Sequence, residues 1–252
     1  MTWPRIRRIL RRTWVGAGVV FMGWMFWSFQ AHGVDPATRE SDADVSVTHA
    51  GDSWRFVPVS GLLSGLVLLP GGLVDPEAYF PLARDLAKSG HAVVVVELPY
   101  RSAPTAAAER RVLRRARAAM AEIGGDRPWI LSGHSKGAAI ATRLIVRAGD
   151  DFAGLVLIGT THPKIDLSGL SVPVLKIGGT KDCVAPRERA ESLIDSLPPN
   201  TRWEWIEGAN HAQFGWYGRQ INDCAASISR TEQQQATVRL LNRFMSAHGS
   251  AS

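Results

Sequence analysis

The sequence has few cysteines and histidines, and few basic residues in excess outside its N-terminus. It contains two cysteines and seven histidines, with no group of His, Cys and Asp at the spacing of metal ligands, so we expect neither a metal nor an organic cofactor. No internal repeat is visible, so nothing points to a repeat architecture. The net charge is +6, but arginines within residues 5–12 supply five of these charges. Because the rest of the chain is almost neutral, we expect no nucleic-acid binding by the folded domain.

Acidic residues are also missing from the N-terminus, where none occurs before Asp35. Residues 1–12 are basic, and residues 13–34 contain no Arg, Lys, Asp or Glu. At about 1.5 Å per residue, a helix over residues 13–34 would roughly match the ~30 Å hydrocarbon core of a membrane. We therefore predict a single-pass membrane anchor, with the arginines in the cytoplasm and the later residues outside it. The alternative is a signal peptide, whose cleavage would leave a secreted domain.

Beyond a polar linker at residues 35–52, short apolar runs alternate with helical patterns. The runs GLVLLP, AVVVVELP and FAGLVLIG are typical of parallel strands that are buried on both faces of a sheet. Between two such runs, Val112, Ala116, Ala119 and Ile123 repeat at helical spacing. This alternation predicts an α/β domain over residues 53–248, with a doubly wound and mostly parallel sheet.

One serine stands between two glycines where a predicted strand, WILSG, turns into a predicted helix. The motif Gly133-His134-Ser135-Lys136-Gly137 has the pattern of a nucleophile elbow, a strained turn that lifts the serine hydroxyl above the sheet. Glycine at both flanking positions avoids collisions between Cβ atoms and the adjoining strand and helix. Ser135 is therefore the candidate nucleophile.

A serine needs a base to accept its proton, and in this topology the acid and the base come later in the chain. His211 follows the last predicted strand and is the candidate base. Asp182 follows the preceding strand and is the candidate acid. Asp166 and Asp195 are its competitors, but one lies before that strand and the other lies late in a helix.

The glycine-rich loop LLPGGLV follows the first buried strand and predicts an oxyanion hole. We expect the backbone N–H groups of Leu73 and Lys136 to form it, with Gly72 as the alternative donor. The Lys136 side chain opposes the helix dipole, so we expect it to be solvated, to attract a substrate carboxylate or to pair with Glu97.

The surroundings of the predicted site offer few covering residues. Only 14 residues separate the strand near Ile158 from the strand near Pro173, which is too short for a cap domain. The candidate pocket residues are His162, Phe214 and Trp216, although the two aromatic residues equally fit packing of the histidine loop.

The two cysteines lie close in sequence to the candidate acid and base. Cys183 follows Asp182 directly, and Cys224 lies beyond the loop that carries His211. Both loops are expected at the carboxyl end of the sheet. In an exported domain we therefore expect a disulfide between the two cysteines.

Taken in order, the segments LLPGG, GHSKG, GGTKD and NHAQFGWYG resemble the α/β-hydrolase superfamily, and most of all its small, lidless alpha/beta hydrolase fold-5 branch. The resemblance spans about residues 54–247 and implies a triad of Ser135, Asp182 and His211, with Asn210 beside the base. We therefore expect a serine hydrolase that cleaves a small-molecule or lipid-like acyl ester through an acyl-enzyme. The alternatives are an acyltransferase with the same triad and a catalytically silent binding module.

Overall fold

A computed structural model describes residues 3–161 and 165–249. Within these residues, eight strands form one sheet in the order β1-β2-β4-β3-β5-β6-β7-β8. Strands β3 to β8 run parallel, while β1 and β2 add an antiparallel edge. The strands are β1 (Val45–Ala50), β2 (Ser53–Pro58), β3 (Ser64–Leu69), β4 (His91–Val96), β5 (Trp129–His134), β6 (Gly154–Ile158), β7 (Val174–Gly179) and β8 (Arg202–Ile206).

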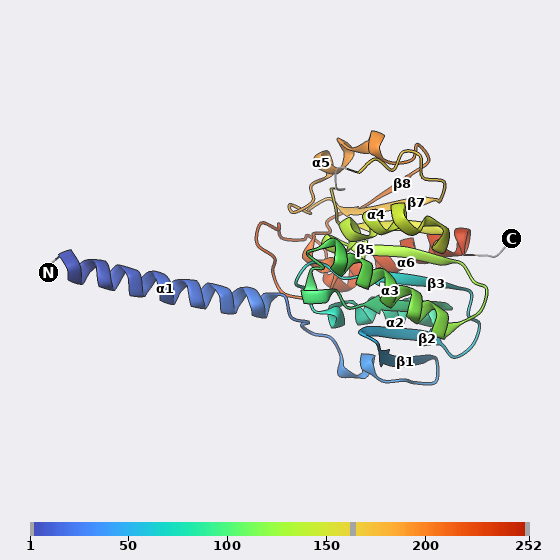
Figure 1. The fold of residues 1–252 in the computed structure, drawn as a ribbon, viewed down its shortest axis with the longest axis horizontal. Helices are drawn as coiled ribbons and strands as arrows, with labels where there is room; N and C mark the ends of the chain where they lie inside the picture. The colour runs from blue at the N-terminus through green and yellow to red at the C-terminus, as the bar shows by residue number, and fades with distance from the viewer. Residues whose placement is uncertain (1–2, 162–164, 250–252) are drawn as a thin grey trace.

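Helices cover both faces of this sheet (Figure 1). Side chains of α2 and α6 share one apolar cluster with the sheet, and side chains of α3 and α4 share the other. The predicted doubly wound, mostly parallel sheet is thereby confirmed. The helices are α1 (Trp3–Ser28), α2 (Phe80–Lys88), α3 (Ala106–Ile123), α4 (Lys136–Ala148), α5 (Arg187–Glu191) and α6 (Arg230–His248).

Strand β4 illustrates why the sequence folds in this way. All six of its residues are buried, because successive side chains point to opposite faces and both faces are covered. Val93 and Val95 enter the cluster beneath α2, and Val94 enters the cluster beneath α3. A continuous apolar run is therefore stable here only between two helical layers, each buried valine contributing about 1.5–3 kcal/mol.

The parallel arrangement brings the loops that carry the candidate residues to one edge of the sheet. The loops after β3, β5, β7 and β8 all leave the carboxyl ends of their strands, which is where open α/β sheets bind ligands. Residues 165–173, the described part of the chain just before β7, contain no helix or strand. That stretch adds no cap element over this edge.

Helix α1 differs in extent from the transmembrane anchor predicted at residues 13–34. The helix begins at Trp3 and ends at Ser28, so only residues 13–28 of it follow the last arginine. At about 1.5 Å per residue they span about 24 Å, less than the ~30 Å of a bilayer core. Among the described helices, none is long and apolar enough to cross a membrane. The structure therefore does not support the predicted transmembrane helix.

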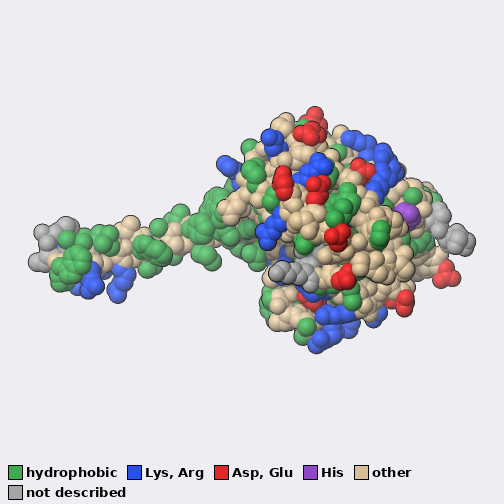
Figure 2. Space-filling view, turned by 90° about the horizontal axis from the view of Figure 1, so that it is seen from above, with side chains coloured by type: hydrophobic (Ala, Val, Ile, Leu, Met, Phe, Trp, Pro, Cys, Tyr) green, Lys and Arg blue, Asp and Glu red, His purple; other side chains and the backbone are tan. Residues whose placement is uncertain are grey.

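The same helix projects away from the sheet (Figure 1), and Figure 2 shows hydrophobic side chains along its length. Trp14 is 82% exposed and Val20 is 73% exposed. The chain joins the domain just after the helix, where the N–H of Gly218 donates to the carbonyl of Ser28 at 2.7 Å and the N–H of His32 donates to the carbonyl of Trp216 at 2.7 Å. The end of α1 is thus fastened to the loop that follows the candidate base.

The predicted linker at residues 35–52 also differs from the structure. It contains strand β1, which pairs antiparallel with β2. Val45 and Val47 are buried, while the alternate side chains of the strand face outward and are polar. This alternation is typical of a strand at an antiparallel edge. The strand was not predicted because it is short and most of the residues around it are polar.

Candidate active site

Ser135 occupies a strained turn between β5 and α4. Its φ is 52° and its ψ is −114°, a backbone conformation that a residue other than glycine rarely adopts. A Cβ at Gly133 would lie 2.3 Å from the carbonyl carbon of Gly137, and a Cβ at Gly137 would lie 2.1 Å from the carbonyl oxygen of Leu69. Both glycines are therefore required for the turn to close. The Ser135 N–H donates to the carbonyl of Ile158 at 2.9 Å, which fixes the serine beside β6.

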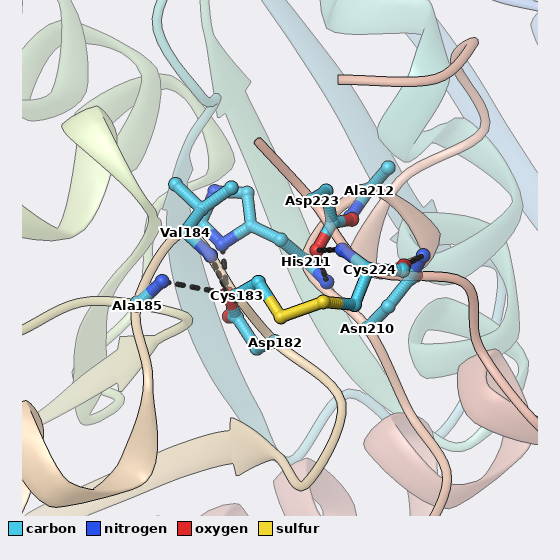
Figure 3. Close-up of a disulfide and its surroundings, with 9 residues drawn as sticks. All are labelled: Asp182, Cys183, Val184, Ala185, Asn210, His211, Ala212, Asp223 and Cys224. Atoms are coloured by element: carbon cyan, nitrogen blue, oxygen red, sulfur yellow. Dashed lines mark hydrogen bonds and ion pairs between the residues drawn. A yellow bond between two sulfur atoms is a disulfide. The ribbon is translucent and has the colours of Figure 1, made fainter. Parts of the chain in front are cut away.

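The structure brings His211 and Asp182 together although 29 positions separate them. The Nδ1 of His211 lies 2.8 Å from Oδ2 of Asp182, and both side chains are almost fully buried. The other carboxylate oxygen, Oδ1, accepts the N–H groups of Val184 at 2.9 Å and Ala185 at 2.7 Å. Figure 3 shows these bonds converging on Asp182. The carboxylate is therefore held by the turn after β7 and orients the ring of His211.

The remaining ring nitrogen of His211 is available as a proton acceptor. With Nδ1–H donated to Asp182, the neutral ring carries its lone pair on Nε2. That atom is buried and has no hydrogen-bond partner in the described part of the chain. The ring also lies near the elbow, because its centroid is 4.6 Å from that of His134, the neighbour of Ser135. This arrangement can accept a proton from a group that enters the site.

The competing carboxylates lie elsewhere. Asp166 and Asp195 are both exposed, and Asp166 accepts the N–H of Ser168 at 2.9 Å in a surface turn. The geometry therefore assigns the carboxylate partner of His211 to Asp182.

In the described residues, no group of three or more His, Cys, Asp and Glu side chains is arranged to hold a metal ion.

The structure corrects one predicted oxyanion donor. The N–H of Leu73 donates to the carbonyl of Arg101 at 2.6 Å, so it is not free to bind a substrate oxygen. The predicted alternative, Gly72, lies against the elbow, where a Cβ would meet the Cβ of Lys136 at 3.1 Å. Lys136 begins α4, whose first N–H groups have no partner within the helix. Gly72 and Lys136 therefore remain as the candidate donors.

The side chain of Lys136 is exposed, as expected for a solvated cation. The predicted pairing with Glu97 is wrong. Oε1 of Glu97 instead lies 3.0 Å from Nε2 of His49 and accepts the indole N–H of Trp54 at 3.2 Å. Both partners come from the antiparallel edge of the sheet, which the sequence pattern did not place beside β4.

A buried tyrosine supports the glycine loop, and sequence reasoning missed it. Tyr79 Oη accepts the N–H of Gly71 at 2.9 Å and lies 2.8 Å from Nδ1 of His134. Burial lowers the pKa of His134 well below its ordinary value, and the nearby His211 lowers it further. Burial also raises the pKa of Tyr79. A neutral hydroxyl and a neutral imidazole therefore connect the elbow to the loop after β3.

A second carboxylate holds the backbone of the candidate base, and this residue was also missed. Asp223 accepts the N–H of His211 at 3.2 Å and the N–H of Ala212 at 2.9 Å. Burial raises the pKa of Asp223, and the carboxylate of Asp182 raises it to a lesser degree. The only sequence signal was that Asp223, like Asp182, directly precedes a cysteine.

The two cysteines form a disulfide between the loops that carry these carboxylates. Cys183 and Cys224 are bonded, with their Cα atoms 5.3 Å apart. Figure 3 shows the disulfide next to His211 and Asn210. Asn210, the neighbour that the resemblance implied, donates from Nδ2 to the carbonyl of Cys224 at 2.8 Å.

The candidate pocket residues fall into two groups. Phe214 is buried and its ring centroid lies 5.6 Å from that of His134, so it packs beneath the histidine loop. Trp216 is half-buried, with the guanidinium of Arg230 5.5 Å from its ring centroid. Both aromatic residues therefore pack the loop, which was the alternative expected for them. His162 lies outside the described residues.

Comparisons with known proteins identify the family of the chain. Residues 65–235 match the Alpha/beta hydrolase family. Two curated relatives, the pimeloyl-[acyl-carrier protein] methyl ester esterases of two serotypes of Yersinia pseudotuberculosis, are each 38% identical over 61 residues. This segment is 24% of the present chain, and the chain spans only 23% of the length of each relative.

Solved structures share the fold at low sequence identity. A structure from work on the metagenome-derived lipolytic enzymes LipS and LipT is 16% identical with a TM-score of 0.59, covering 81% of this chain and all of that one. Est1E from Butyrivibrio proteoclasticus is 12% identical with a TM-score of 0.57, covering 82% and 99%. Thermogutta terrifontis esterase 2 is 18% identical with a TM-score of 0.57, covering 81% and 94%. With the family match across most of the chain, these findings confirm the resemblance, and the chain belongs to the alpha/beta hydrolase family.

Proposed function

We propose that the protein is a serine hydrolase that cleaves carboxylic esters through an acyl-enzyme, with Ser135 as nucleophile, His211 as base and Asp182 as acid. The observation that carries this proposal is the state of the His211 ring. Its Nδ1 is fixed by a buried carboxylate at 2.8 Å, while its Nε2 is buried without a partner in the described residues. A ring held in this way near a strained serine is prepared to take up the hydroxyl proton.

In the first half of the reaction, Oγ of Ser135 bonds to the ester carbonyl carbon and its proton moves to Nε2 of His211. The negative charge that develops on the carbonyl oxygen is stabilised by the N–H groups of Gly72 and Lys136. The bond to the alcohol oxygen then breaks, and that oxygen takes the proton from His211. The alcohol leaves, and the acyl group remains on Ser135.

In the second half, a water molecule adds to the acyl carbon and gives a proton to His211. The bond between the acyl carbon and Oγ of Ser135 then breaks, and Oγ recovers the proton. The carboxylic acid leaves, and the protein returns to its first state. Throughout, Asp182 keeps the same ring nitrogen protonated and stabilises the imidazolium while it exists.

We further infer that the substrate is a small-molecule or lipid-like ester. Ser135 is only half-buried, and the described residues just before β7 add no cap element above it. The curated relatives are methyl ester esterases, and the solved structures with this fold include lipolytic enzymes and esterases. An open site of this kind accommodates esters of different size, so the acyl chain length is a property to be measured.

Active-site labelling tests this function directly. The full chain is treated with a fluorophosphonate probe beside Ser135→Ala, and hydrolysis of p-nitrophenyl esters of increasing acyl length is measured for both. We expect labelling and hydrolysis by the wild type alone. Absence of both in the folded wild type would favour a silent binding module. Preferential transfer of the acyl group to an added alcohol over water would favour an acyltransferase.

We also propose that the domain works in an oxidising compartment outside the cytoplasm. The Cys183–Cys224 disulfide supports this location, because cytosolic reductants keep such thiols reduced. Alkylation of the protein from its native source, before and after reduction, gives the test. We expect both cysteines to be protected until reduction, and two free thiols in the native protein would reject this location.

A further inference from the structure

The chain contains the dipeptide Asp-Cys twice, at residues 182–183 and 223–224. The two cysteines are bonded to each other, and both aspartates contact His211. Figure 3 shows His211 between the two aspartates, with the disulfide passing beside it. The two Asp-Cys pairs therefore form one cluster around the candidate base, in which both aspartates bind His211 and the two cysteines bind each other.

The two carboxylates hold different parts of His211. Asp182 binds the ring, with Oδ2 2.8 Å from Nδ1. Asp223 binds the backbone, because its oxygens accept the N–H of His211 at 3.2 Å and the N–H of Ala212 at 2.9 Å. Two bonds to consecutive amides fix the direction of the backbone from which the ring extends. The direction that Asp223 fixes is the one in which the ring reaches Asp182.

Asp223 belongs to an irregular segment of the chain. It lies in residues 219–228, between a short 3-10 turn, Ala212–Phe214, and helix α6, and this segment has no helix or strand. Besides the disulfide, the middle of the segment is attached through Asn210, which donates to the carbonyl of Cys224 at 2.8 Å, and through the N–H of Ser227, which donates to the carbonyl of Gly208 at 2.9 Å. Its ends are held by Ser28 Oγ, which donates to the carbonyl of Arg219, by Tyr217 Oη, which donates to Gln220 at 3.1 Å, and by Gln213 Nε2, which donates to the carbonyl of Ile228 at 3.1 Å. Among the described residues, the covalent bond between Cys224 and Cys183 is the one bond that ties this segment to the loop of Asp182.

We propose that Asp223 is a positioning residue for His211 and that the Cys183–Cys224 disulfide fixes the position of Asp223, which holds the backbone of His211, relative to Asp182, which holds its ring. This inference rests on the proposed ester hydrolysis. It assigns Asp223 no contact with substrate. Its effect is on the orientation of His211, so it changes the rate of the chemical steps and leaves substrate binding almost unchanged.

The first test is Asp223→Asn, which keeps the volume and replaces one acceptor oxygen by an N–H₂ group that faces a backbone N–H. We expect kcat for a p-nitrophenyl ester to fall on the order of 10- to 100-fold, since a misplacement of about 1 Å has that effect on catalysis, with KM within about twofold. The matched control is the exposed Asp195→Asn, expected to match the wild type. A folded Asp223→Asn with wild-type kcat would overturn the proposal.

The second test cuts the disulfide without changing Asp223. A water-soluble phosphine reduces the S–S bond of the wild type to two thiols and becomes the phosphine oxide, taking its oxygen from water. We expect kcat to fall by a similar factor at unchanged KM and to return on reoxidation. Cys183→Ser/Cys224→Ser should start at the low value and ignore the phosphine. Full reduction with no change in kcat would overturn the role of the disulfide.

A third measurement separates this inference from the proposed function. The proton that His211 Nδ1 donates to Asp182 gives a downfield ¹H NMR resonance, whether or not the protein has the proposed activity. We expect the resonance to shift or broaden in Asp223→Asn and in the reduced protein, and to be unchanged in Asp195→Asn. If the wild type hydrolyses no ester, the proposed function fails while this resonance still tests the positioning. An unaltered resonance in both perturbed forms would reject it.

Discussion

The hydroxyl of Tyr79 lies 2.8 Å from Nδ1 of His134, and the same oxygen accepts the N–H of Gly71 at 2.9 Å. This single buried side chain connects the residue before Ser135 to the glycine loop after β3. Its two hydrogen bonds set the distance between the elbow and the loop that carries the candidate donor Gly72. The fit between these two elements therefore depends on a residue with no catalytic chemistry of its own.

Removing this hydroxyl is predicted to reduce both stability and rate. Tyr79→Phe leaves the Gly71 N–H and the His134 ring without their partner in a buried site, at a cost of about 1–3 kcal/mol for each unsatisfied group. Urea unfolding at pH 7 measures this loss, and kcat for a p-nitrophenyl ester should fall as well. Tyr100→Phe, at a tyrosine that is 81% exposed, is the control and should change neither. Unchanged stability in Tyr79→Phe would contradict the proposed support.

The buried carboxylate of Asp182 is predicted to be required for the rate of reaction. Asp182→Asn presents an N–H₂ group to His211 and favours the wrong ring tautomer, so kcat should fall by about 10⁴-fold, as in other triads. The exposed Asp166→Asn is the matched control and should retain wild-type kcat. Steady-state ester hydrolysis by the two variants gives the comparison, and a loss of less than about tenfold in Asp182→Asn would argue against the triad.

Gly137, the second flanking glycine of the elbow, is predicted to tolerate no side chain. The Cβ of Gly137→Ala would lie 2.1 Å from the carbonyl oxygen of Leu69, a backbone atom that cannot move aside easily. We expect a loss of about 3 kcal/mol or more in the free energy of unfolding, together with loss of fluorophosphonate labelling. Gly149→Ala, whose Cβ meets nothing within 4 Å, should be neutral or stabilising by up to ~1 kcal/mol. Denaturant titration of both variants decides between these outcomes.

A buried lysine predicts how stability depends on pH. Lys176 in β7 donates to the carbonyl of Thr160, and burial lowers its pKa from 10.5 to about 7. Above pH 7 the folded lysine is neutral while the unfolded chain still binds the proton. The unfolded state therefore holds more protons, and the free energy of unfolding must rise with pH until the unfolded lysine loses its proton as well.

Chemical unfolding between about pH 7.5 and 9.5 tests this dependence, because the rise for a full proton is about 1.4 kcal/mol per pH unit. Lys176→Met removes the titrating group and should flatten the curve, whereas Lys88→Met at an exposed position should keep the wild-type slope. Equal slopes for the wild type and Lys176→Met would show that Lys176 keeps an ordinary pKa.

Much of the fold was predictable because its signals are local. The apolar run of β4 requires cover on both faces wherever it lies, and the glycines around Ser135 are compatible with few other turns. His211 and Asp182 were predictable from their places after consecutive strands, since parallel strands bring such loops to one edge. The place of each residue directly after its strand was enough to predict that the two side chains lie together.

Other features depended on partners that lie far away in the chain. Leu73 was expected to offer a free N–H, but the turn after β4 presents the carbonyl of Arg101 to it. The N-terminal helix was expected to continue to residue 34, but it ends at Ser28, whose carbonyl accepts the N–H of Gly218. No pattern within either segment contains these partners.

The sequence by itself determined the alternation of strands and helices, the strained serine turn and the order of the candidate triad, because each follows from side-chain volume, periodicity and chain direction. Only the tertiary structure decided which backbone N–H groups stay free, where α1 ends and that Asp223 holds His211. Those outcomes depend on hydrogen bonds between groups that are distant in sequence. Such bonds form only after the sheet has brought the loops together.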